Sequence, residues 1–312
     1  MVEPLFERRT FLRTAGVGAV AAALGAPHVA RAAHVAFGAG APSGATRPGA
    51  TRPGETGPGE SGPVRLGVAS YSLRKMPRDQ AIAAVKALGT SYVNVKSVHA
   101  DYALAPAELA AARRAFEGAG LAIVGGGTIT FDKDTDADVE RYFAYAKGLG
   151  MPLIVATGAP AVLPRVERFA KQYDVKVAIH NHGPEDKHYP SPYDVLKLVR
   201  PMDRRMGLCI DVGHTTRAGD DVVQAIADAG PRLLDMHVKD LRDLKVKESQ
   251  CIVGEGQMPV ADIFRQLQTM RYPGYVNLEY EIDADDPMPG MQRSFAYMRG
   301  VLAGLAPAAR RS

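Results

Sequence analysis

Apolar and polar side chains alternate along several short segments of the chain. At 175–182, the apolar side chains of Val175, Val177 and Ile179 are spaced two residues apart, with His180 and His182 in the opposite phase. Successive side chains of a strand point to opposite faces, so this alternation predicts a strand with one apolar and one polar face. The same pattern recurs at 206–211, 232–239 and 275–281.

Strand-like and helix-like segments take turns over most of the chain. The predicted strands are 64–70, 92–97, 121–125, 152–157, 175–182, 206–211, 232–239 and 275–281. The predicted helices are 77–88, 106–119, 135–148, 162–173, 192–199, 220–229, 259–270 and 289–304. Proline suits the first turn of a helix, and four of these segments begin with it: Pro77, Pro106, Pro192 and Pro259.

Eight strand–helix units predict an α/β fold of one domain, a (β/α)8 TIM barrel over 64–305. An open doubly wound sheet is the alternative, but no Gly-rich phosphate loop follows the first strand. The apolar faces are expected to lie under the helices: Leu208, Ile210, Leu234, Met236, Val238, Val276, Leu278 and Tyr280. The polar faces are expected to point into the barrel: Asn94, Lys96, His180, His182, Asp211, His237, Lys239, Glu279 and Glu281.

The N-terminal segment has the pattern of an export signal. Arg8 and Arg9 precede an apolar run at 15–26 and the small-residue cleavage site Ala-Arg-Ala at 30–32. We therefore predict a twin-arginine signal peptide at 1–33, the twin-arginine translocase as an export partner, and a periplasmic or secreted protein without a membrane anchor after cleavage. A buried N-terminal helix is the alternative. Residues 34–63, rich in Gly and Pro with a doubled Ala-Thr-Arg-Pro-Gly, predict a disordered linker, and 306–312 a short tail.

Charge and cysteine content exclude some functions. The chain has 38 basic and 34 acidic side chains; without the four Arg and two Glu of 1–33, 34 and 32 remain, a net charge of +2. Such a balance does not predict nucleic-acid binding. Cys209 and Cys251 have no spacing that suggests a disulfide, so single structural thiols are favoured. Nothing in the pattern predicts an oligomeric state.

Polar side chains at the C-terminal strand ends suggest a metal site, because barrel enzymes keep their chemistry there. Two imidazoles and two carboxylates suit Mn, Zn, Co or Fe(II) better than Ca, and leave positions open for substrate. Four unrelated polar residues are the alternative interpretation. The predicted ligands are His180, Asp211, His237 and Glu279.

Other inward or rim residues are candidates for proton transfer and substrate binding. The catalytic candidates are His182, His214, Lys96 and, in reserve, Glu281. The candidates for substrate contacts are His99, Arg217 and Lys239. A structural ion pair of Lys239 with Asp240 or Glu281 is an alternative, as is a rim salt bridge for Arg217. His188 is interpreted as a loop residue.

Four strings resemble the xylose-isomerase-like TIM barrels, the sugar phosphate isomerase/epimerase superfamily. They are Ala-Ile-His-Asn-His-Gly at 178–183, Cys-Ile-Asp-Val-Gly-His at 209–214, Met-His-Val-Lys-Asp at 236–240 and Asn-Leu-Glu-Tyr-Glu at 277–281. The resemblance covers about 64–305. It implies one divalent metal, most often Mn, at the four ligand positions, and substrate contact by His214.

The chain departs from the family at His180, where the superfamily has a Glu that also serves as a base in epimerases. Ordinary two-carboxylate epimerisation is therefore in doubt. The His-Asn-His-Gly variant resembles an exported branch associated with keto-sugar or keto-glycoside lyases and hydratases. We expect proton abstraction next to a metal-polarised carbonyl of a sugar or keto-sugar, with a keto-glycoside lyase or hydratase as the alternative outcome. An endonuclease-IV-like nuclease and a metal-free sugar-binding barrel are more distant alternatives.

The export signal can be tested directly. Replacing Arg8 and Arg9 together by Lys is expected to keep the protein in the cytoplasm, because the paired arginines distinguish this route. The measurement is the share of protein in the periplasmic fraction, with a Lys substitution at Arg13 as the control. Efficient export of the double variant would contradict the twin-arginine assignment.

Overall fold

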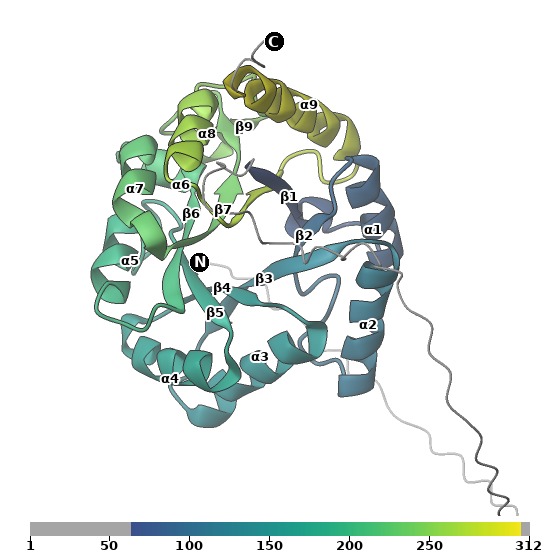
Figure 1. Cartoon of the computed structure of the whole chain (residues 1–312), viewed down its shortest axis with the longest axis vertical. Coiled ribbons are helices and arrows are strands. Elements are labelled where there is room, and N and C mark those ends of the chain that lie inside the picture. The colour runs from purple at the N-terminus through teal and green to yellow at the C-terminus, as the bar shows by residue number, and fades with distance from the viewer. Residues whose placement is uncertain (1–63, 307–312) are drawn as a thin grey trace, which may run out of the picture. The chain divides into compact units, whose positions relative to one another are not determined.

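The computed structural model describes residues 64–306 and places eight strands in a closed parallel barrel. In Figure 1 the helices surround the central strands. Around the barrel the order is β1, β10, β7, β6, β5, β4, β3, β2. The predicted single (β/α)8 barrel is therefore confirmed, and the open sheet is excluded. The predicted signal peptide, linker and most of the tail lie outside the described residues.

The bounds of the elements agree with the predicted ranges to within a few residues, apart from β3. The barrel strands are β1 (Arg65–Ala69), β2 (Tyr92–Val95), β3 (Ala122–Phe131), β4 (Leu153–Gly158), β5 (Lys176–His180), β6 (Met206–Asp211), β7 (Leu233–Val238) and β10 (Tyr275–Leu278). The helices that match predictions are α1 (Arg78–Ala87), α2 (Pro106–Gly118), α3 (Asp136–Leu149), α4 (Leu163–Tyr173), α5 (Pro192–Val199), α7 (Val222–Ala229), α8 (Val260–Thr269) and α9 (Met288–Leu305).

Three local features were not predicted. Strand β3 continues to Phe131, six residues beyond the expected end, and so extends the wall of the barrel mouth. The short helix α6 (Val212–Arg217) starts directly after β6. A small antiparallel pair, β8 (Asp240–Leu241) with β9 (Gln250–Cys251), follows β7. All three are short or Gly-containing, so hydrophobic periodicity gives little signal for them.

Apolar side chains form two sets, one outside the barrel and one inside it. The outer set packs between strands and helices and includes the predicted faces of β5, β6 and β10. The inner set is Leu153, Val155, Ala178 and Cys209. Leu234 was expected on the outer face but packs against the inner set, because the pairing of β6 with β7 shifts register there and disturbs the alternation.

A buried polar layer also lies inside the barrel. The Asp235 carboxylate accepts hydrogen bonds from Asn94 at 2.9 Å and Asn277 at 2.8 Å, which joins β2, β7 and β10. Burial raises the pKa of Asp235 to about 7. The Asn277 side chain packs against Gly67, where any larger residue would clash, because a Cβ there would lie 2.4 Å from Asn277 Oδ1.

The structure describes the state of both cysteines and the character of the helices. Cys209 and Cys251 are both buried and free, as single thiols were expected to be. Among residues 64–306, none of the helices combines the length and apolarity that a membrane crossing requires.

Candidate metal centre

The four predicted ligands converge at the C-terminal mouth of the barrel. They come from β5, β6, β7 and the residue after β10, and one ligand atom from each lies within 4.8 Å of the others: His180, Asp211, His237 and Glu279. The His180 and His237 rings are 4.9 Å apart between centroids. Adjacent strands that end at the same level therefore bring residues up to 99 positions apart to one point.

Several buried donor atoms of this cluster have no hydrogen bond of acceptable geometry: His180 Nε2, Asp211 Oδ2 and both ring nitrogens of His237. Their close neighbours are charged groups, with Lys239 Nζ 3.0 Å from Asp211 Oδ2 and Glu279 Oε1 3.3 Å from His237 Nδ1. Buried polar atoms are nearly always hydrogen-bonded, so a group of them facing one another needs another explanation. Imidazole nitrogens and carboxylate oxygens at this spacing fit a divalent transition-metal ion.

Asp211 divides its two oxygens between the fold and the cluster. Oδ1 accepts the backbone N–H of His214 at 2.8 Å and caps the start of α6, while Oδ2 faces His180 Nε2 at 3.8 Å. Asn181 supports this arrangement, because its side chain accepts the Asp211 N–H at 3.0 Å and donates to Thr215 at 3.0 Å. The turn after β6 thus holds the carboxylate with one oxygen available to a ligand.

Lys239 is the counter-ion of the mouth. Its Nζ lies 3.0 Å from Asp211 Oδ2, 2.9 Å from Glu279 Oε2 and 2.6 Å from Glu281 Oε2. The structural ion pair with Glu281 is therefore present, and Asp240 instead accepts backbone N–H groups of its own loop. Three carboxylates and one ammonium leave two negative charges, which a divalent cation would neutralise.

Burial holds His180 and His214 neutral. Burial alone would also lower the pKa of His237, but the neighbouring Cys209 and Glu279 raise it well above its usual value. Burial, with the neighbouring His237, lowers the pKa of His180 well below its usual value, as a metal ligand requires. Burial and then the Lys239 charge lower the pKa of His214 to about 2. The side chain of His182 is 58% exposed, and its ring lies 4.7 Å from that of His214.

A cavity of about 390 Å³ opens over the cluster. Burial lowers the pKa of Lys96, whose Nζ lies 5.2 Å from the centre of the Tyr71 ring. Hydrophobic patterning could not identify the hydroxyl groups of the facing wall, because threonine is common in any strand. The cavity is lined by Tyr71, Lys96, Thr128, Thr130, Thr157, His180, His182, His214, Glu279 and Glu281.

His99 does not lie where a substrate-binding residue was expected. It is buried, its Nδ1 lies 2.9 Å from Ser70 Oγ, and its Nε2 lies 3.2 Å from the carbonyl oxygens of Leu73 and Met76. Both ring nitrogens are thus engaged with the segment after β1, and His99 is absent from the cavity wall. The alternating pattern could not show this, because His99 follows its strand and no longer obeys the strand parity.

Arg217 is buried beside the histidines. It forms an ion pair with Glu185, and its Nη1 lies 3.2 Å from His214 Nδ1. Gly183 makes this packing possible, since a Cβ there would meet the Arg217 and His214 side chains at 3.0–3.1 Å. The predicted rim salt bridge is present, and His188 lies in the loop as interpreted.

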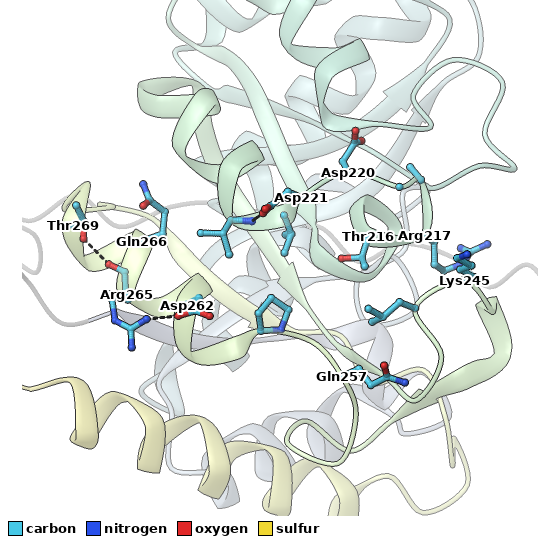
Figure 2. A pocket seen from close by; sticks show the side chains of 16 residues that line it. Thr216, Arg217, Asp220, Asp221, Lys245, Gln257, Asp262, Arg265, Gln266 and Thr269 are labelled. Atoms are coloured by element: carbon cyan, nitrogen blue, oxygen red, sulfur yellow. Dashed lines mark hydrogen bonds and ion pairs between the residues drawn. The ribbon is translucent and has the colours of Figure 1, made fainter.

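A larger hollow of about 1090 Å³ lies between α7 and α8, outside the barrel mouth (Figure 2). None of the four candidate ligands lines it. Its Asp262 and Arg265 pair with each other on α8, as the dashed line in Figure 2 shows. We therefore place the candidate active site in the cavity of about 390 Å³ over the four candidate ligands.

The fold and the cluster place this protein among the TIM-barrel proteins in which imidazoles and carboxylates converge at the barrel mouth. Residues 82–301 match the family described as "Xylose isomerase-like TIM barrel", and the chain belongs to this family.

Proteins of known name or structure agree with this placement. An inosose dehydratase of Mesomycoplasma hyopneumoniae (strain 7448) is 22% identical over 160 residues, 45% of this chain and 53% of that protein. The chain thus spans about half the length of this relative. The structure of D-psicose 3-epimerase with D-fructose aligns with a TM-score of 0.64 at 19% identity, over 77% of this chain and all of that chain. A probable 3-DHS dehydratase from Bacillus anthracis aligns with the same score at 12% identity, over 76% and 99%. These structural likenesses establish the fold.

The metal set can be tested by a substitution that keeps the helix cap. Asp211→Asn retains a capping oxygen but loses the charge, so we expect the folded protein to lose at least about 100-fold in metal affinity, as Asp211→Ala would also do. The measurement is metal content by mass spectrometry in protein purified without a His tag, with exposed Asp286→Asn as the control. Normal metal content in Asp211→Asn would exclude Asp211 as a ligand.

His214 predicts a dependence of stability on pH. Its folded-state pKa, about 2, lies below the ordinary value, so above the unfolded pKa of about 6.5 neither state is protonated. As pH falls below that value only the unfolded state takes up the proton, and stability is lost. Between pH 7.5 and 5.0, metal-free wild-type protein should lose about 1–2 kcal/mol more than His214→Gln in denaturant titrations. His188→Gln is the control, and equal losses in wild type and His214→Gln would contradict the shift.

Proposed function

We propose that this protein is a divalent-metal-dependent enzyme that removes a proton next to the carbonyl group of a keto-sugar. The observation that carries the proposal is the convergence of His180, Asp211, His237 and Glu279 beneath a polar cavity. Mn is the ion we favour, with Zn, Co and Fe as alternatives. The names of the relatives, dehydratases and an epimerase of sugar-like compounds, support the substrate class.

A bound divalent ion would supply Lewis-acid polarisation of the substrate carbonyl. The four ligands would hold it at the mouth, and the threonines of β3 and β4 would orient substrate hydroxyl groups from the facing wall. Lys96 also faces the cavity, where a cation would stabilise negative charge that develops on oxygen.

His182 is the residue we favour for moving the proton. It lines the cavity, and its exposure lets it exchange protons with solvent. His214 is the second choice for this role, because burial lowers its pKa to about 2 and a neutral imidazole is better suited to orient a substrate oxygen. Glu281 forms an ion pair with Lys239, whose Nζ lies 2.6 Å from Glu281 Oε2.

Elimination is a second candidate outcome, favoured by the identity of residue 180. A carboxylate there could bind metal and also act as a base, whereas a metal-bound imidazole nitrogen has its lone pair engaged. Epimerisation requires a base on each of two sides of a substrate carbon. Without a carboxylate at residue 180, the site has fewer groups that could serve as those bases. Proton removal followed by loss of a neighbouring hydroxyl group would make the protein a dehydratase or lyase, in line with the dehydratases among its relatives.

The proposal is tested by incubating metal-loaded protein in D₂O with a panel of keto-sugars and ketoses. Isomerisation or epimerisation is expected to place deuterium at the carbon next to the carbonyl. Elimination is expected to give an unsaturated ketone without deuterium at that carbon, so deuterium position and product identity together separate the outcomes. His182→Ala should keep its metal but lose about 100-fold or more in turnover, as for a general acid–base residue. His188→Ala is the control, because His188 is half-buried in the loop after β5 and does not line the cavity.

Two results would overturn parts of this proposal. Full activity of His182→Ala would move the proton-transfer role to Lys96 or His214. Metal binding with neither exchange nor an elimination product on any member of the panel would contradict the reaction class, and absence of metal would favour a sugar-binding barrel. His180→Glu is expected to keep a metal without becoming an efficient epimerase, and brisk epimerisation by the unaltered protein would contradict the elimination outcome.

A further inference from the structure

The cavity over the cluster adjoins a second chamber. The first, of about 390 Å³, is lined by His180 and Glu279 of the candidate metal set. The second, of about 520 Å³, is lined by none of the four candidate ligands. The chambers share four polar wall residues, which mark the junction: Tyr71, His182, His214 and Glu281. Small-ligand pockets span roughly 300–1,000 Å³, so each chamber is large enough for one part of a substrate.

The far wall of the second chamber is held in place by backbone contacts. Gln250 on β9 donates from Nε2 to the Glu279 carbonyl at 2.7 Å and accepts the Glu281 N–H at 3.1 Å. The Asp240 carboxylate accepts the N–H groups of Gly254 at 2.8 Å and Gly256 at 3.1 Å. The β8–β9 hairpin is thereby tied to the end of β10, and the chamber is preformed rather than a gap beside a loose loop.

The lining of the second chamber suits a neutral ring. Leu241, Ile282 and the Tyr71 ring offer apolar surface, and the imidazoles and Gln250 offer polar groups beside it. A sugar ring has the same division, with apolar C–H faces and a polar edge. Such a mixed surface is what specific small-molecule sites present.

The charges of the chamber argue against a phosphate. Arg217 is paired with Glu185, and Lys239 with Glu281. Lys247 is exposed, and Glu248 beside it also lines the chamber. Each cation thus has a carboxylate partner or neighbour, whereas phosphate sites present unpaired cations or convergent backbone N–H groups.

We infer that the substrate has two parts: a keto-sugar ring in the first chamber, joined to a second, neutral sugar ring in the second chamber. This inference rests on the proposed function for the first ring and adds the class of substrate, a keto-glycoside of disaccharide size. The bond between the rings would lie at the junction, within reach of His182 and His214.

Binding can test the second chamber independently of turnover. Calorimetry on metal-loaded protein would compare a hexose, its methyl glycoside, its 6-phosphate and a disaccharide containing the same hexose, all without the keto group. The disaccharide is expected to bind about tenfold or more tightly than the methyl glycoside. A gain in affinity of this magnitude is what contacts in one additional pocket provide. Equal affinity would overturn the inference, and tightest binding of the phosphate would overturn its neutral character.

Substitutions locate the effect. Ile282→Trp fills the second chamber and should lower the disaccharide-to-hexose affinity ratio about tenfold. Val246→Trp is the matched control, because Val246 lies on the loop between β8 and β9 beside the chamber residue Lys247, is 43% exposed and does not line the chamber. An unchanged ratio in Ile282→Trp would place the second ring elsewhere and overturn the assignment. Deuterium exchange with the keto forms tests the reaction separately, so its failure would leave the binding result standing.

Discussion

The barrel mouth depends on one buried ammonium group, that of Lys239. Three carboxylates from β6 and the end of β10 surround it, and without it their mutual repulsion in a buried site would be severe. Its position depends in turn on Gly213, since a Cβ there would lie 2.9 Å from the Lys239 side chain. The turn after β6 thus serves the helix cap, the candidate metal ligand and the counter-ion together.

Strand parity predicted the fold and the metal set for a simple physical reason. A period of two is a strong signal, and parallel strands in a barrel end at one level, so His180, Asp211 and His237 could be assigned to one face before their positions were known. The same reasoning failed where the period is interrupted. Leu234 lies at a register shift, and His99 lies beyond the end of its strand.

Other parts of the site left no signal in the pattern. The Thr wall belongs to an unexpected extension of β3 and to β4, and threonine carries no distinctive chemistry in sequence. The Asp235–Asn94 contact joins residues 141 positions apart. Alternation places both residues inside the barrel but does not show which polar partners meet across it. Contacts across a barrel depend on tilt and stagger, which no single strand reveals.

The cavity takes its walls from two halves of the barrel. The candidate ligands come from β5, β6, β7 and β10, which are neighbours in the sheet, whereas Lys96 and the threonines come from β2, β3 and β4. A change among the candidate ligands alters the metal cluster, whereas a change among the threonines alters only the hydroxyl groups that the opposite wall presents. Substitutions at these threonines alone can therefore change which ligand such a barrel accepts, while the metal cluster on the other strands is kept.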